Sequence, residues 1–210
     1  MIFQNVNYKY SSNLVFRRTA LNDYQIKTRK RVRDFGEVYT AQKQVRDMLD
    51  LVPDLALDTT YLEPACGNGN FLAEILKRKL SRVDTGNTQA TNRDFFICIS
   101  TIYGVDIQTD NVEESRARML CIADETYTTI TGDALPADLR QLFQTVLSYN
   151  IVCGNTLQPQ DLTFSEWVLA GNKVKQREYL FQDMLVHGGT SGRCIEERIY
   201  TWHVYQHEAA

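Results

Sequence analysis

A glycine-rich turn and a carboxylate, each following a short apolar run, are the residues of this sequence best suited to binding a small ligand. Gly67 and Gly69 lack side chains, so the backbone between them can turn sharply and approach a ligand closely. The helical pattern that follows would offer free backbone N–H groups in its first turn. Asp106 ends another apolar run, where a carboxylate can accept hydrogen bonds from both hydroxyls of a ribose. These features predict a site for a ligand with an adenosine and an amino-acid tail, whose carboxylate can use the helix N-terminus.

The same turn does not match the two common phosphate-binding loops. Leu72 stands where a dinucleotide-binding loop has its third glycine, and no Gly-Lys-Ser/Thr is present. The separation between Gly69 and Asp106 exceeds the usual spacing of about 20 residues in dinucleotide-binding folds. An inserted loop and helix at residues 81–101 would explain the difference.

Short apolar runs alternate with helical patterns on both sides of the turn. The runs predict strands at residues 59–63, 102–107 and 150–153, and the helical patterns lie at residues 41–52, 71–80, 93–101, 111–123 and 135–148. This alternation predicts an α/β fold, a mostly parallel sheet with helices on both faces. Because ligands bind at the carboxyl ends of such strands, Glu63, the glycine turn, Asp106 and Asn155 are expected to meet there.

The two ends of the chain differ from this middle part. Residues 1–34 are predicted to be a basic, irregular arm, residues 35–158 a ligand-binding domain, and residues 159–210 a C-terminal extension. Within the extension, residues 160–184 predict a hairpin and a helix. Glycines at 188–192 separate these from a last segment that we expect to be helical, with Glu196 and Glu197 on a solvated face.

Three segments resemble adenine-specific DNA methyltransferases of restriction–modification systems. The run Leu62-Glu63-Pro64-Ala65-Cys66-Gly67-Asn68-Gly69-Asn70-Phe71-Leu72 is similar to their Asp-Pro-Ala-Cys-Gly-x-Gly-x-Phe-Leu cofactor loop. Phe35-Gly36-Glu37-Val38-Tyr39-Thr40 resembles their Gly-x-x-Tyr/Phe-Thr-Pro segment, with Ala41 in place of proline, and Tyr103-Gly104-Val105-Asp106-Ile107 resembles their Tyr-Gly-x-Asp-Ile strand. The three matches follow the family's order. Phe164-Ser165-Glu166-Trp167 resembles small methylation subunits.

The resemblance implies a Rossmann-like methyltransferase fold that binds S-adenosylmethionine. It places Glu63 near the amino-acid tail of the cofactor, Gly67 and Gly69 along its methionine and ribose, and Pro64 and Ala65 among the cofactor-binding residues. By the same resemblance, Phe71 packs nearby, Asp106 holds the ribose, Ile107 covers the adenine and Thr40 touches the methionine end.

The family's catalytic motif, Asp/Asn-Pro-Pro-Tyr/Phe after the fourth strand, is the part that the sequence lacks. No Pro-Pro occurs, and the nearest candidate is Asn155-Thr156-Leu157-Gln158. Asn155 is either a degraded catalytic residue or the end of the third strand, where it would bind the adenine amine of the cofactor. Gly132-Asp133 is a second candidate for the end of the third strand, and with that choice Asn155 takes the catalytic position.

Two functions from different classes therefore remain open. One is an adenine-specific DNA methyltransferase that acts on a base flipped out of double-stranded DNA. The other is a catalytically inactive, S-adenosylmethionine-binding subunit that supports a partner restriction or specificity subunit. Transfer to another amine, in RNA or protein, is a third reading.

Composition limits the remaining classes. The 210 residues have a net charge of −3, and no apolar run is long enough to span a bilayer, so we expect a cytoplasmic protein. Five cysteines without a Cys-x-x-Cys pair suggest neither disulfides nor zinc, and His203 and His207 lack a third ligand, so no metal is expected. The basic stretch from Lys27 to Arg33 is either a phosphate-binding arm or a solvated one.

Overall fold

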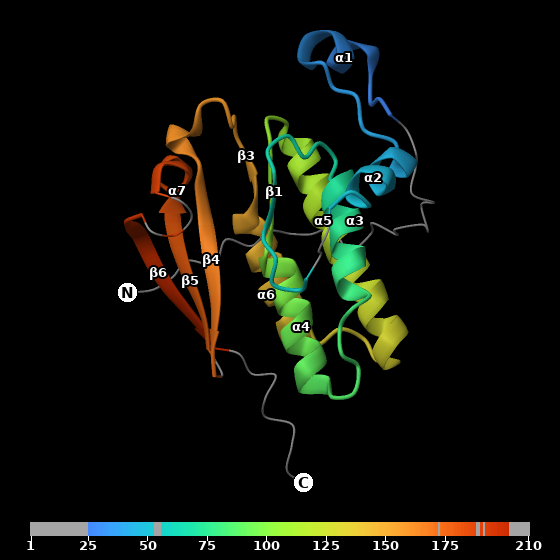
Figure 1. The fold of residues 1–210 in the computed structure, drawn as a ribbon, viewed down its shortest axis with the longest axis vertical. Helices are drawn as coiled ribbons and strands as arrows, with labels where there is room; N and C mark the ends of the chain where they lie inside the picture. Colours follow the sequence, from blue (N-terminus) through green and yellow to red (C-terminus); the bar gives the residue numbers. More distant parts are fainter. Residues whose placement is uncertain (1–24, 53–55, 172, 188–189, 191, 202–210) are drawn as a thin grey trace.

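The computed structural model describes residues 25–52, 56–171, 173–187, 190 and 192–201, and it contains two sheets (Figure 1). Strands β1 (Tyr61–Glu63), β2 (Ile102–Asp106) and β3 (Ile151–Cys153) form a parallel sheet in the order β1-β2-β3. Strands β4 (Thr163–Ala170), β5 (Lys173–Leu180) and β6 (Cys194–Thr201) form an antiparallel sheet. The predicted strands at 59–63, 102–107 and 150–153 are confirmed, each within two residues of its bounds.

Between two parallel strands the chain must return to the starting end of the sheet. Two helices make this return in each of the two connections. Helices α3 (Asn70–Leu80) and α4 (Thr88–Ser100) join β1 to β2, and helices α5 (Thr109–Thr131) and α6 (Ala137–Asn150) join β2 to β3. Helix α3 packs against α5 and α4 packs against α6, and all four contact the central strand β2. The fold is therefore a mixed α/β arrangement with a parallel sheet among helices.

Apolar side chains at helical spacing bury α3 and α4 against this sheet. The buried residues of α3 include Leu72, Ile75, Leu76 and Leu80, as the spacing predicts. Helix α4 begins earlier than predicted, because Asn87 caps it by accepting hydrogen bonds from the backbone N–H groups of Gln89 and Ala90.

The helix predicted at 111–123 is longer in the structure. Helix α5 begins two residues earlier than predicted, after Gln108, which caps it without a side-chain hydrogen bond. The helix continues to Thr131 and ends at Gly132, whose φ of 79° is left-handed. Asp133 thus follows a helix, and β3 is the third strand of the parallel sheet.

A buried lysine fixes the amino-terminal end of the parallel sheet. The ammonium of Lys79, a fully buried residue, donates hydrogen bonds to the Leu57 carbonyl at 3.0 Å, the Thr59 carbonyl at 2.5 Å and the Thr101 hydroxyl at 2.6 Å. Burial lowers the pKa of Lys79 to about 8. The three bonds join α3 to the segment before β1 and to the end of α4, so they fix the entry of two strands.

The N-terminal part is more ordered than the sequence suggests. Residues 29–34, predicted to be irregular, lie in helix α1 (Arg29–Phe35), which Thr28 caps and Gly36 ends. Helix α2 (Gln42–Leu49) lies within the predicted helix 41–52 and buries Val45 and Leu49. Residues 1–24 of the predicted arm lie outside the described residues, as does Pro53, which follows the predicted helix 41–52.

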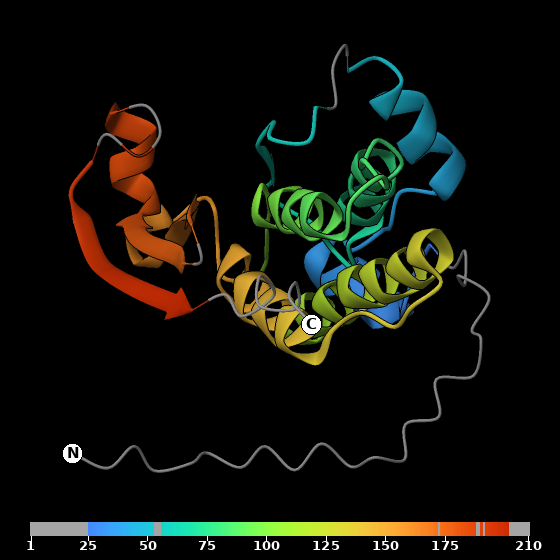
Figure 2. The same cartoon turned by 90° about the horizontal axis from the view of Figure 1, so that it is seen from below.

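The antiparallel sheet lies to one side of the helical layers, as Figure 2 shows from below. The predicted hairpin and helix are confirmed as β4, β5 and α7 (Phe181–His187), which follow the short 3-10 helix η1 (Pro159–Asp161). The Trp167 indole N–H donates to the Asn150 side-chain oxygen at 2.8 Å, which joins β4 to α6. Phe164 and Phe181 pack edge to face on the other side of the sheet.

The last segment is a strand, and the prediction of a helix there is wrong. Strand β6 pairs with β5, where Arg177 faces Glu197 and Glu178 faces Glu196. Arg177 forms an ion pair with Glu197 at 2.8 Å, and Arg198 forms one with Glu178 at 3.1 Å. Charged neighbours in this segment thus pair across strands, which helical spacing cannot reveal.

Candidate functional site

The carboxyl ends of the three parallel strands meet at one edge of the sheet, as predicted. Glu63 ends β1, Asp106 ends β2, and Asp106 lies opposite Cys153 of β3. The Cys66 backbone N–H donates to the Val105 carbonyl at 2.8 Å, so the glycine turn continues alongside the end of β2. The loop after β3 reaches the same place, because the Thr156 hydroxyl donates to the Pro64 carbonyl at 3.2 Å.

Both glycines of the turn (residues 64–69) are required by its geometry. Gly67 and Gly69 have φ values of 53° and 83°, which side-chain-bearing residues rarely adopt. A Cβ at Gly69 would lie 2.3 Å from the Ser115 hydroxyl oxygen, and one at Gly67 would lie 3.1 Å from the Tyr39 ring. The turn is thus pressed between α5 and the segment before α2.

Asp106 is bound directly to this turn. One carboxylate oxygen accepts from the Gly67 backbone N–H at 2.9 Å. The other accepts from the Gln108 backbone N–H at 2.8 Å and from the Asn111 side-chain amide at 3.1 Å. Asp106 is half-buried, and a carboxylate can accept about four hydrogen bonds, so acceptor capacity remains after these three.

Asn111 connects Asp106 to the N-terminal segment. It is 1% exposed, and its side-chain oxygen accepts from the Tyr39 hydroxyl at 2.8 Å and from the Lys27 ammonium at 2.8 Å. Its amide nitrogen donates to Glu37 at 2.9 Å as well as to Asp106. Burial, followed by the Glu37 carboxylate, raises the pKa of Tyr39, so its hydroxyl stays protonated and can donate.

Two cations of the predicted basic arm are engaged at the start of α5. The Lys27 ammonium lies 3.1 Å from Asp110 and 2.8 Å from Glu114. The Arg31 guanidinium lies 2.5 Å from both Glu37 and Asp110. The Arg31 guanidinium, and then Lys27, hold the pKa of Asp110 down at about 2. Lys27 and Arg31 are therefore committed within the chain rather than presented as phosphate contacts.

The remaining predicted site residues lie around this edge at different depths. Glu63 is half-buried and accepts from the Ala65 backbone N–H at 3.2 Å, and Ile107 is 52% exposed directly after Asp106. The Asn155 side chain accepts from the Leu157 backbone N–H at 3.0 Å. Phe71 packs against the hydrophobic core, so it supports the turn from behind.

Thr40 meets the site through its backbone. Its carbonyl accepts from the Asn70 side-chain amide at 2.8 Å, which ties the segment before α2 to the first residue of α3. In the turn itself, Asn68 is 2% exposed, and its side-chain oxygen has no hydrogen-bond partner among the residues that the structure describes.

Cys66 lies in the turn but is not suited to nucleophilic chemistry. Burial, together with the carboxylates of Asp106 and Glu63, raises the pKa of its thiol to about 12. The thiolate, which is the reactive form, is therefore disfavoured.

Sequence reasoning missed Asn111, Lys27 and Arg31 as parts of this edge. A signal exists only for Asn111: it lies four residues before Ser115 and eight before Met119, so a polar residue occupies the buried face of α5. The partners of Lys27 and Arg31 on α5 lie 79 to 87 positions along the chain, and sequence spacing does not reveal such contacts.

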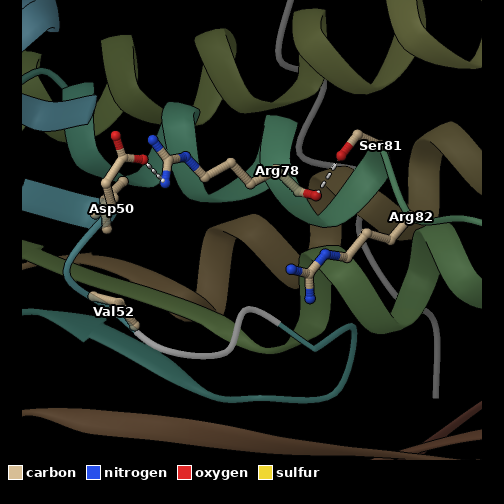
Figure 3. A pocket seen from close by; sticks show the side chains of 6 residues that line it. Asp50, Val52, Arg78, Ser81 and Arg82 are labelled. Carbon is tan, nitrogen blue, oxygen red and sulfur yellow. Dashed lines mark hydrogen bonds and ion pairs between the residues drawn. The ribbon is translucent and has the colours of Figure 1, made fainter. Parts of the chain in front are cut away.

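Two hollows lie away from this edge. Figure 3 shows one of about 340 Å³, between the ends of α2 and α3, where Asp50 pairs with Arg78 at 2.8 Å. Another lies among α2, α3 and α5 and is lined by residues that include Asn70, Glu74 and Arg118. Neither includes Asp106 or the residues of the glycine turn.

The described part of the chain contains neither a candidate metal site nor a candidate membrane span. No group of three or more His, Cys, Asp or Glu side chains there could hold a metal ion. No helix in these residues is long and apolar enough to cross a membrane.

Comparison with known proteins gives one partial similarity. No family model matches the chain, and no solved structure matches it. A stretch of 84 residues, 40% of this chain, is 33% identical to the Type II methyltransferase M.VspI of Vibrio sp. (strain 343). The match covers 16% of that protein. Part of this chain is therefore similar to a short part of a methyltransferase.

Proposed function

We propose that this chain binds S-adenosylmethionine at the carboxyl edge of its parallel sheet, as a methyltransferase-type cofactor-binding subunit. The observation that carries the proposal is the 2.9 Å hydrogen bond from the Gly67 N–H to Asp106. It joins the glycine turn after one strand to the acid after the neighbouring strand, two features that nucleotide-binding α/β folds combine. The partial similarity to a methyltransferase supports this choice of nucleoside.

The strand order supports a Rossmann-like fold for the proposed binding domain, residues 35–158. A classic doubly wound sheet has the order 3-2-1-4-5-6, and its ligand lies where the order reverses, beside strand 1. The order β1-β2-β3 corresponds to the first half of that sheet. Among the described residues, no further strand pairs with β1 on its other side.

The chemistry of the edge fits an adenosyl group. In this proposal Asp106 accepts from the ribose hydroxyls, using its remaining capacity or releasing Gly67. The exposed side chain of Ile107 covers the adenine, and Asn155 accepts from the adenine amine. Glu63 binds the ammonium of the amino-acid tail. When bound, the cofactor supplies a methyl group on a sulfonium, ready for transfer to a nucleophile.

The other proposed contacts come from the turn and its neighbours. Pro64, Ala65, Gly67 and Gly69 approach the ligand through their backbone, Thr40 lies at the methionine end, and Phe71 supports the turn. The unpartnered side-chain oxygen of Asn68 is a buried acceptor within the same turn, and buried polar atoms normally have a partner.

Asn155 is better placed for the cofactor than for catalysis. It follows β3, and β3 pairs with β2 rather than with the free side of β1. The family's catalytic motif belongs after a fourth strand, and the Pro-Pro that would accept from a target amine is absent from the sequence. The position therefore supports the cofactor-binding subunit over complete catalysis by this chain.

An adenine-specific DNA methyltransferase remains the second candidate, because the matching stretch belongs to a methyltransferase. In that case double-stranded DNA is the substrate. In both proposals, the cofactor-binding subunit and the methyltransferase, the partner is a restriction or specificity subunit. With Lys27 and Arg31 engaged in ion pairs, DNA contacts by the described arm would fall to the exposed Arg29 and Lys30.

Calorimetric titration with S-adenosylhomocysteine tests the proposal. Asp106→Asn keeps the shape but weakens the acceptor for two hydroxyls, so we expect at least tenfold weaker binding, about 1.4 kcal/mol or more. Asp133→Asn is the matched control, since Asp133 is exposed after α5, and should bind like the original protein. Equal affinity of all three proteins, or no binding to the original protein, would refute the proposal.

A methyl-transfer assay separates the two candidates. Tritiated S-adenosylmethionine and unmethylated DNA are added to a protein that binds the cofactor. The subunit proposal predicts no labelled DNA from this chain alone. Labelled DNA that Asn155→Ala abolishes would favour the methyltransferase instead.

A further inference from the structure

We propose that Asn111 is a positioning residue that couples Asp106 to the strap, our name for residues 25–40, so that opening of the strap and release of Asp106 occur together. The inference deepens the proposed function in one respect: it takes Asp106 as the group that receives the ribose. The coupling itself is a property of the protein without ligand.

The strap lies across the glycine turn. Tyr39 is 5% exposed, and its ring lies 3.1 to 3.2 Å from the place of a Cβ on Gly67. The Tyr39 backbone N–H donates to the Gln25 carbonyl at 2.7 Å, so the two ends of the strap are joined. Gly67 also donates to Asp106, so the polar groups at this edge of the sheet bind one another. We call this arrangement the closed edge.

Ion pairs hold the strap closed at the first turn of α5. Lys27 contacts Asp110 and Glu114, and Arg31 contacts Asp110 while binding Glu37 within the strap. Each such pair is weak when exposed to water and salt, and the Asp110 side chain is 53% exposed. Several pairs on one segment give a closure that is cooperative and sensitive to ionic strength.

Asn111 makes most of its side-chain hydrogen bonds with residues of the strap. Among the described residues its side chain has four partners: Lys27, Glu37 and Tyr39 belong to the strap, and Asp106 belongs to the sheet. Loss of the strap would remove three of the four partners of Asn111 and leave its bond to Asp106, so the side chain would reorient to bind water with the groups set free. Opening the strap therefore favours a new position for Asn111, and Asp106 loses the bond that orients it.

The coupling has a direct consequence for ligand entry. The closed edge occupies Asp106 and covers Gly67, and a ligand that needs both must select the open form. Weakening the closure raises the population of the open form and with it the apparent rate of binding.

Amide hydrogen exchange of the ligand-free protein tests the coupling. The expected result is that exchange rises together in peptides covering 29–39 and 66–69, by about threefold or more, between ionic strengths of about 0.05 M and about 0.5 M. Arg31→Gln at low salt should reproduce this rise. Tyr39→Phe should too, because it keeps the ring over Gly67 but removes the hydroxyl, which donates to Asn111 at 2.8 Å and lies 3.1 Å from Glu37.

Arg140→Gln is the matched control. It breaks another arginine–aspartate pair, with Asp124 at 3.0 Å, between α6 and a part of α5 remote from the strap, and should leave both peptides unchanged. Faster exchange in 29–39 with an unchanged 66–69 peptide would refute the coupling. Exchange that responds to neither salt nor Arg31→Gln would refute closure by ion pairs.

A second measurement separates this inference from the proposed function. With S-adenosylhomocysteine, Arg31→Gln should raise the association rate about threefold over the original protein, and Arg140→Gln should not. An unchanged association rate for Arg31→Gln would refute the role of the strap in ligand entry. Absence of binding by the original protein would refute the proposed function, while the exchange experiment would still decide the coupling.

Discussion

Gly69 shows how a single residue can be fixed by both its backbone angle and its neighbours. Its φ of 83° is left-handed, and a Cβ would collide with Ser115. Gly132 has a similar φ of 79°, but a Cβ there would meet nothing within 4 Å. A comparison of these two glycines therefore separates the free-energy cost of the left-handed backbone angle from the cost of steric crowding.

Alanine substitutions at these two glycines make that separation measurable. Gly132→Ala should lower the free energy of unfolding by about 1 kcal/mol, the cost of a left-handed alanine. Gly69→Ala should lower it by about 2–4 kcal/mol, because overpacking adds to the same backbone cost. Urea denaturation measures both values, and equal losses would contradict the packing described for the turn.

The sequence predicts that the glycine turn and the acid meet, from the position of each after its strand. A glycine turn after one strand and an acid after another can be read from spacing, and the structure joins Gly67 to Asp106. Asn111 could not be assigned in this way, because its role depends on Tyr39 and Lys27, which lie 72 and 84 positions before it.

At the scale of elements, local sequence patterns predict the strands and helices of the parallel sheet. They fail where the structure of a segment depends on pairing with a distant strand. Helix α3 has buried leucines and isoleucine at helical spacing, so its sequence contains its own signal. The β6 segment has adjacent charges that fit a solvated helix equally well, and only its pairing with β5 makes it a strand. The start of α5 is not marked in the sequence, because its N-cap residue Gln108 makes no side-chain hydrogen bond to the helix.

A buried hydrogen bond joins the antiparallel sheet to the helices. The Asn150 side chain is fully buried, donates to the Ser100 carbonyl at 3.0 Å and to the Ile102 carbonyl at 3.3 Å, and accepts from Trp167. One amide thus holds the start of β2 and the middle of β4 together.

Trp167→Phe tests this junction. It removes the indole donor and leaves the Asn150 oxygen buried without a partner, so thermal or urea unfolding should show a loss of about 1–3 kcal/mol. Tyr179→Phe is the control: it also removes a donor, but its acceptor Glu166 is partly exposed and can bind water. A loss for Trp167→Phe no greater than that for Tyr179→Phe would contradict the role of the junction.

The central feature of the whole molecule is one edge of the parallel sheet. There the ends of three strands and the loops that follow them, between residues 63 and 155, meet beneath the strap. The sequence predicts that meeting because parallel strands place their carboxyl ends together. It does not predict the closed state of the edge, since the ion pairs between α5 and the strap arise only after folding.

The most direct test is a backbone amide NMR titration of the full chain with S-adenosylhomocysteine. Binding at the proposed edge predicts the largest shifts at the amides of Gly67, Gln108 and Asn155, together with residues of the strap. Shifts confined to the hollow around Leu49, Arg78 and Arg82, or no shifts at saturating ligand, would contradict the account.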